Sequence, residues 1–105
     1  MSEFIFTYVV CANAEEATRI GNSLVEERLV ACVNILPAIQ SVYWWEEKIT
    51  QSTEIAFIAK TLRTKFNDVQ QKVLAMHSYD TPCIVALSVE EGNEKYLQWI
   101  KNEVR

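Results

Sequence analysis

Hydrophobic and polar positions in the first part of the chain predict a strand followed by a helix. Residues 4–11 are rich in aromatic and β-branched side chains, which indicates a buried strand. Asn13 follows as a helix N-cap, and Glu16 stands in the capping-box position three residues later. Apolar side chains then recur at helical spacing up to about residue 28. Gly21, inside this helix, predicts a close approach of the helix to the sheet.

The middle of the chain predicts a long hairpin. Leu29–Leu36 is nearly continuous apolar sequence and indicates a second strand, with a bend or bulge at Pro37 because proline lacks a ladder donor. The chain stays extended over Ile39–Trp45. Glu46–Lys48 then forms a polar turn, and Ile49–Thr61 forms a third strand. These strands are much longer than the average of about 5–6 residues, so we expect the hairpin to extend beyond a single small domain.

The last part of the chain predicts a helix, a strand and a terminal helix. Apolar residues at helical spacing predict a helix that ends at His77, and Pro82 ends the turn after it. Cys83–Val89 is the fourth strand, and Asn93 caps a short terminal helix. The order β-α-β-β-α-β-α predicts an α+β fold. It is the ferredoxin-like βαββαβ pattern with an added C-terminal helix and a long hairpin between the second and third strands.

Composition narrows the class of protein. The 105 residues fit one domain, residues 1–105, and 50% hydrophobic residues exclude disorder. The net charge is −4 and the basic residues are scattered, which disfavours nucleic-acid binding. The sequence shows no secretory signal pattern and no apolar run of transmembrane length. We therefore expect a cytoplasmic protein that does not bind to or span a membrane.

The three cysteines predict thiols and no disulfide framework. Cys11, Cys32 and Cys83 are an odd number without CxxC spacing, which argues against a disulfide scaffold or a zinc ribbon. We expect all three to be reduced, with Cys32 and Cys83 in the core. Cys11 is expected to be a buried thiol at the end of the first strand.

The only histidine lies in a segment with metal-ligating side chains. Met76 and His77 place a thioether beside an imidazole, and these donors suit soft or borderline metals. The alternative is that His77, at the end of a helix, hydrogen-bonds the last carbonyls and interacts with the helix dipole.

A run of aromatic residues and two charged residues mark further candidate sites. The aromatic run consists of Tyr43, Trp44 and Trp45, and we interpret it as subunit-interface packing in preference to a cofactor site. Glu54, inside the third strand, is either a pocket carboxylate or a solvated edge residue. Lys60 is a candidate for the same cleft, as is Tyr79.

Together these segments resemble one family. They are Glu27–Ile35 followed by Pro37, Ser41–Trp45, Lys60–Thr61, His77–Pro82 and Tyr96–Ile100. In this order and spacing the whole chain looks like the CutA family of divalent-cation tolerance proteins. The resemblance implies a ferredoxin-like subunit in a tight, intertwined homotrimer, in which the long hairpin reaches into neighbouring subunits. The trimer is similar in architecture to the PII signalling proteins.

The resemblance also implies a metal site. Bacterial members have a Cu(II) site assigned to a cysteine that ends the first strand, which matches Cys11, and to two adjacent histidines. The second of these matches His77, whereas Met76 replaces the first. A thioether suits Cu(I) better than Cu(II), so we expect weak copper binding. Ser78 stands where the family commonly has proline, which loosens the turn before Tyr79. Glu47 stands where the family commonly has glycine, which leaves the type of the hairpin turn open.

Two classes of function follow. The first is a non-catalytic, copper-binding homotrimer in the response and tolerance to divalent metal cations. The alternative is a structural or signalling scaffold trimer, a PII-like small-ligand sensor or an anchor for partners, whose metal contacts are incidental. An enzyme is disfavoured, because no nucleophile stands paired with a base and no glycine-rich phosphate loop is present.

Overall fold

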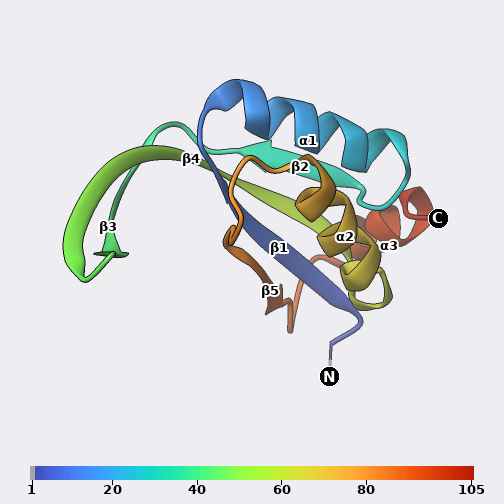
Figure 1. Ribbon diagram of the computed structural model, residues 1–105. Coiled ribbons are helices and arrows are strands. Elements are labelled where there is room, and N and C mark those ends of the chain that lie inside the picture. The colour runs from blue at the N-terminus through green and yellow to red at the C-terminus, as the bar shows by residue number, and fades with distance from the viewer. Residues whose placement is uncertain (1) are drawn as a thin grey trace.

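The computed structural model describes residues 2–105 as a sheet with helices on both faces (Figure 1). The elements in chain order are β1 (Phe4–Cys11), α1 (Ala14–Glu26), β2 (Cys32–Ile35), β3 (Ile39–Trp45), β4 (Lys48–Leu62), a 3-10 turn η1 (Arg63–Lys65), α2 (Phe66–Met76), β5 (Ile84–Ser88) and α3 (Glu94–Glu103). The strands lie in the order β2-β4-β1-β5, and β3 pairs with the start of β4. All pairings are antiparallel, which confirms the α+β order of elements.

The core lies between the sheet and helices α1 and α2. Every second side chain of β1 is buried, as the two-residue period of a strand requires when one face is covered. The core side chains include Val9, Ile20, Leu24, Phe57, Val69 and Val73, all fully buried. An ideal Cβ on Gly21 would lie 3.1 Å from Val33 Cγ1, which confirms the close approach of α1 to the sheet.

The C-terminal end of α1 shortens the second strand. The N–H of Leu29 donates to the carbonyl of Leu24 at 3.1 Å, and the N–H of Arg28 donates to Val25 at 3.0 Å. Arg28 takes a φ of 61°. These two bonds form a Schellman motif, which keeps residues 27–29 in a helix-terminating turn. The predicted strand Leu29–Leu36 is therefore wrong in extent, because the strand itself covers only Cys32–Ile35.

The long hairpin forms an arm that projects from the rest of the molecule (Figure 1). Strand β4 continues from the sheet into the arm and pairs there with β3 from Ile39↔Glu54 to Trp45↔Lys48. The two residues of the turn have positive φ, 48° at Glu46 and 64° at Glu47. Positive φ at both central positions is typical of a type I′ turn, the favoured two-residue connection of a hairpin. The break between β2 and β3 falls at Pro37, as expected.

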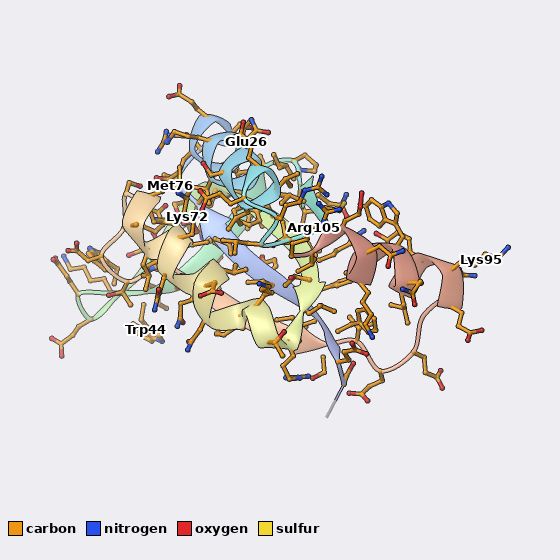
Figure 2. All side chains as sticks on the ribbon, turned by 90° about the vertical axis from the view of Figure 1, so that its right-hand side faces the viewer. Glu26, Trp44, Lys72, Met76, Lys95 and Arg105 are labelled. Carbon is orange, nitrogen blue, oxygen red and sulfur yellow. The ribbon has the colours of Figure 1, made fainter. Side chains whose placement is uncertain are left out.

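The arm has two different faces, because directly paired residues share a face and neighbours along a strand alternate. We call one the Glu54 face, which carries Ile39, Ser41, Tyr43, Trp45, Lys48, Thr50, Ser52 and Glu54. The other, the Trp44 face, carries Val42, Trp44 and Ile49. Trp44, labelled in Figure 2, is 72% exposed. The aromatic run is thus divided, with Tyr43 and Trp45 on one face and Trp44 on the other.

The cysteines are unpaired, and only one lies in the core. Cys11 is buried, Cys32 is half-buried and Cys83 is exposed. The expectation that Cys32 and Cys83 lie in the core is wrong. Cys32 pairs with Lys60, whose side chain lies on the face opposite α1 and α2. That face is only partly covered, by α3, so thiols on it do not reach the core. No helix within residues 2–105 is long and apolar enough to cross a membrane.

Candidate metal centre

The imidazole of His77 is held by hydrogen bonds from two directions. Helix α2 ends at Met76, and His77 leaves it in an extended conformation, with its N–H bonded to Val73 at 2.9 Å. The side chain is fully buried. Its Nε2 lies 2.8 Å from the carbonyl of Val10, and its Nδ1 lies 3.0 Å from the N–H of Tyr79. Because Nδ1 accepts from Tyr79, Nε2 carries the proton and donates to Val10.

Glu16 joins the start of α1 to the loop after α2. Its Oε1 accepts from the N–H of Ala12 at 3.0 Å, and its Oε2 accepts from the N–H of Ser78 at 2.9 Å. Oε1 also lies 3.8 Å from His77 Nδ1. Burial raises the pKa of Glu16, but the hydrogen bonds from Ala12 and Ser78 more than offset it and leave the pKa below its ordinary value. Glu16 is therefore ionised at neutral pH.

Cys11 completes a compact group at the end of β1. Its side chain is fully buried. Burial, and next the negative charge of Glu16, raise the pKa of the Cys11 thiol to about 12. The sulfur of Cys11, a carboxylate oxygen of Glu16 and a ring nitrogen of His77 all lie within 4.8 Å of one another. The group thus combines a thiol, a carboxylate and an imidazole.

This donor set fits a borderline divalent ion if the ion displaces the Tyr79 N–H from His77 Nδ1 and the proton from the Cys11 thiol. The bond from Nε2–H to Val10 fixes the tautomer that leaves Nδ1 as the ring's lone pair, which is the usual arrangement around a metal-binding histidine. An ion at Nδ1 would take the place of the Tyr79 N–H. An ion at Cys11 would take the place of the thiol proton, because the thiolate is the ligand form.

The whole length of the chain matches one family of proteins. The sequence profile of the CutA1 divalent ion tolerance protein family matches residues 5–103. The chain belongs to the CutA1 family. The divalent-cation tolerance protein CutA of Archaeoglobus fulgidus is 50% identical over 99 residues, which cover 94% of this chain and 96% of that protein. The crystal structure of CutA1 from Oryza sativa matches with a TM-score of 0.96 and 42% identity, over 99% of this chain and 95% of that one.

Some relatives are longer. The chloroplastic protein CutA 1 of Oryza sativa is 44% identical over 101 residues, 96% of this chain and 57% of the plant protein. The match to the CutA1 family confirms the resemblance seen in the sequence.

The structure brings Cys11 and His77 together and adds Glu16, which the sequence had indicated only as a capping residue. Met76 packs instead against the edge of the hydrophobic core at the end of α2 (Figure 2). The sequence position of Glu16 could have indicated that its carboxylate is buried. It stands four residues before Ile20, on the apolar stripe of α1, where a carboxylate needs buried hydrogen-bond donors.

A second group of candidate residues lies next to this centre. The Tyr79 hydroxyl donates to Glu54 Oε2 at 2.8 Å, and the Tyr79 ring centroid lies 4.9 Å from that of His77. A pocket of about 320 Å³ opens here. Its lining consists of Tyr43, Trp45, Glu54, Tyr79, Asp80 and Thr81. Lys60 lies elsewhere, because its Nζ donates to the Tyr96 hydroxyl at 3.0 Å and stands over the Phe6 ring.

Proposed function

We propose that this protein is a non-catalytic homotrimer that acts in tolerance to divalent cations and binds a copper ion, or a similar ion, through Cys11, Glu16 and His77. The observation that carries the proposal is the convergence of three different ligand atoms within 4.8 Å in a buried group. Membership of a divalent ion tolerance family supports a metal ion as the ligand class.

The chemistry of the donors favours copper. Copper(II) stands at the top of the affinity order of divalent first-row metals for mixed nitrogen, oxygen and sulfur sites, and thiolate also suits copper(I). The proposed site does not need Met76, whose thioether packs against the core. Since binding displaces the proton of Cys11, whose pKa is about 12, affinity should rise with pH.

The test is a copper titration of protein first treated with a chelator. We expect one Cu(II) per chain, with a sulfur-to-copper charge-transfer band, and weaker binding at pH 5.5 than at pH 7.5. His77→Ala and Cys11→Ser should each weaken binding about 10–100-fold. Cys83→Ser is the matched control, because it removes an exposed thiol and leaves the group intact. If His77→Ala binds copper as tightly as the wild type at pH 7.5, the proposed copper site is wrong.

Exposed apolar side chains support the homotrimer. Val42, Trp44 and Ile49 on the Trp44 face are 63%, 72% and 68% exposed, and Leu87 on β5 is 53% exposed. Apolar surface of this kind marks a protein interface, and obligate interfaces bury more than about 2,000 Å² in total.

Sedimentation tests the assembly. We expect a trimer that is weakened by replacing Trp44 and Trp45 together with alanine. Trp99→Ala, which removes a half-exposed indole from α3, is the control. A well-folded wild-type monomer at micromolar concentration would contradict the trimer.

A scaffold without a functional ion is the second candidate, and one observation favours it. His77 and Glu16 are fully hydrogen-bonded to backbone groups without an ion, and Cys11 is protonated, so the group also serves to tie β1, α1 and the loop after α2 together. Copper binding that is weak and insensitive to both His77→Ala and Cys11→Ser would favour this candidate.

A further inference from the structure

We propose that the pocket between the hairpin arm and the loop after α2 binds a small alkylammonium ion, with Glu54 as its counter-ion and Tyr43, Trp45 and Tyr79 as its aromatic walls. This site is distinct from the group of Cys11, Glu16 and His77.

Glu54 supplies a buried carboxyl group with no basic side chain of residues 2–105 bonded to it. Its side chain is only 9% exposed, and it forms no ion pair with another residue of the described chain. One oxygen accepts from the Tyr79 hydroxyl at 2.8 Å. Buried carboxylates are normally paired with a cation, because removing an ionised group from water is costly. A cation beside Glu54 would offset the cost of burying its carboxylate.

The walls of the pocket fit a cation of organic character. Tyr43 and Trp45 alternate onto the Glu54 face of the arm, and Tyr79 reaches the same carboxylate from the loop. The Tyr43 hydroxyl lies 3.1 Å from Ser52 Oγ, a contact that helps to fix its ring. Aromatic faces attract ammonium groups, most strongly Trp, and arrays of such rings recognise methylated ammonium ions.

The donor set argues against a metal ion in this pocket. Hard divalent cations need several oxygen ligands, whereas three of the six lining residues are aromatic. The Tyr79 hydroxyl already donates to one Glu54 oxygen at 2.8 Å, which leaves fewer oxygen lone pairs for a metal ion. Asp80 adds a second carboxylate, and no basic residue belongs to the lining. A volume of about 320 Å³ suits a small molecule.

The experiment uses choline as the probe and 3,3-dimethyl-1-butanol, its neutral carbon isostere, as the comparison. Binding is followed by calorimetry and by tryptophan fluorescence, which Trp45 should report. We expect saturable binding of choline and binding of the neutral isostere at least tenfold weaker. The protein is treated with a chelator beforehand, so the result does not depend on copper.

Two pairs of variants locate the site. Glu54→Gln keeps the shape and an acceptor for Tyr79 but removes the charge, and it should weaken choline binding at least tenfold. Glu90→Gln, at an exposed position, should leave it unchanged. Trp45→Leu should weaken binding, whereas Trp99→Leu, on α3 and outside the pocket lining, should not. Thermal melting checks that each variant is folded. Tyr79→Phe is a milder change in the pocket, because it keeps the aromatic ring and removes only the hydroxyl.

Three outcomes would overturn the proposal. The first is equal binding of choline and its neutral isostere. The second is unchanged choline binding in folded Glu54→Gln. The third is no choline binding by the wild type together with a shift in oligomeric state in Glu54→Gln, which would mean that a second copy of the chain supplies the cation. None of these results depends on copper binding at Cys11 and His77, so the two proposals fail separately.

Discussion

The two hydrogen bonds that Glu16 accepts predict how the substitution Glu16→Gln changes the stability of the protein. Glu16→Gln removes the negative charge but keeps nearly the same shape. Each carboxylate oxygen accepts one backbone N–H, from Ala12 and from Ser78. A glutamine has one acceptor oxygen, so one N–H would then face an NH₂ group. Hydrogen bonds to charged groups contribute about 1.5–3 kcal/mol each, and one is lost while the other is weakened. We therefore expect Glu16→Gln to lower the free energy of unfolding by about 2–3 kcal/mol at pH 7.

The pKa of Glu16 also determines how this stability difference changes with pH. The pKa of Glu16 is lower in the folded protein than its ordinary value of 4.5, so the folded state favours the ionised form. This contribution is fully present above that ordinary value, which the unfolded chain keeps, and is lost as the pH falls through the folded pKa. The difference between the wild type and Glu16→Gln should therefore be constant from pH 6 to 8 and shrink below about pH 4.5.

Chemical denaturation of chelator-treated protein, at one fixed chain concentration, measures the difference, because the stability of an oligomer depends on concentration. Glu15→Gln is the matched control, since Glu15 lies in the same turn but is exposed. A Glu16→Gln protein as stable as the wild type at pH 7, or a difference that persists unchanged to pH 3, would refute the assignment of these hydrogen bonds.

Three further predictions concern the backbone and the thiols. Replacing Glu46 with Asn and Glu47 with Gly should stabilise the hairpin by about 1–2 kcal/mol, because both positions have positive φ; a lower denaturation midpoint would contradict this. Arg28→Gly should stabilise by up to about 1 kcal/mol in the same assay, since the Arg28 side chain loses only an exposed ion pair to Glu103 at 3.6 Å and an exposed, long hydrogen bond to the Glu103 carbonyl at 3.4 Å. A thiol reagent should modify exposed Cys83 in the native protein and Cys11 only after unfolding, with three free thiols in total; rapid native labelling of Cys11 would exclude its burial.

The sequence predicts the order of elements well because each element has its own local signal. The N-caps Asn13 and Asn93 both accept from a backbone N–H three residues on, as their positions suggested. The polar turn between two long apolar strands likewise indicated the arm. The predicted start of β2 was wrong because the turn that ends α1 has Arg28 at positive φ. A glycine at this position would have marked the end of the helix in the sequence.

The candidate site was harder to predict, because it depends on contacts between distant segments. His77 was indicated by its residue type and Cys11 by a family resemblance, whereas Glu16 joins them only because α1 and the loop after α2 meet at the end of β1. The burial of Glu54 depends in the same way on Tyr79, twenty-five residues further along the chain. By contrast, the division of the aromatic run between two faces follows from strand alternation alone.

Tyr79 belongs to both candidate sites. Its N–H donates to His77 Nδ1, and its hydroxyl donates to Glu54. An ion bound at Nδ1 would displace the first of these bonds and so disturb the residue that makes the second. The two binding equilibria would then be thermodynamically linked. Linkage is reciprocal, so the factor by which copper changes the affinity for an ammonium ion is also the factor by which that ammonium ion changes the affinity for copper.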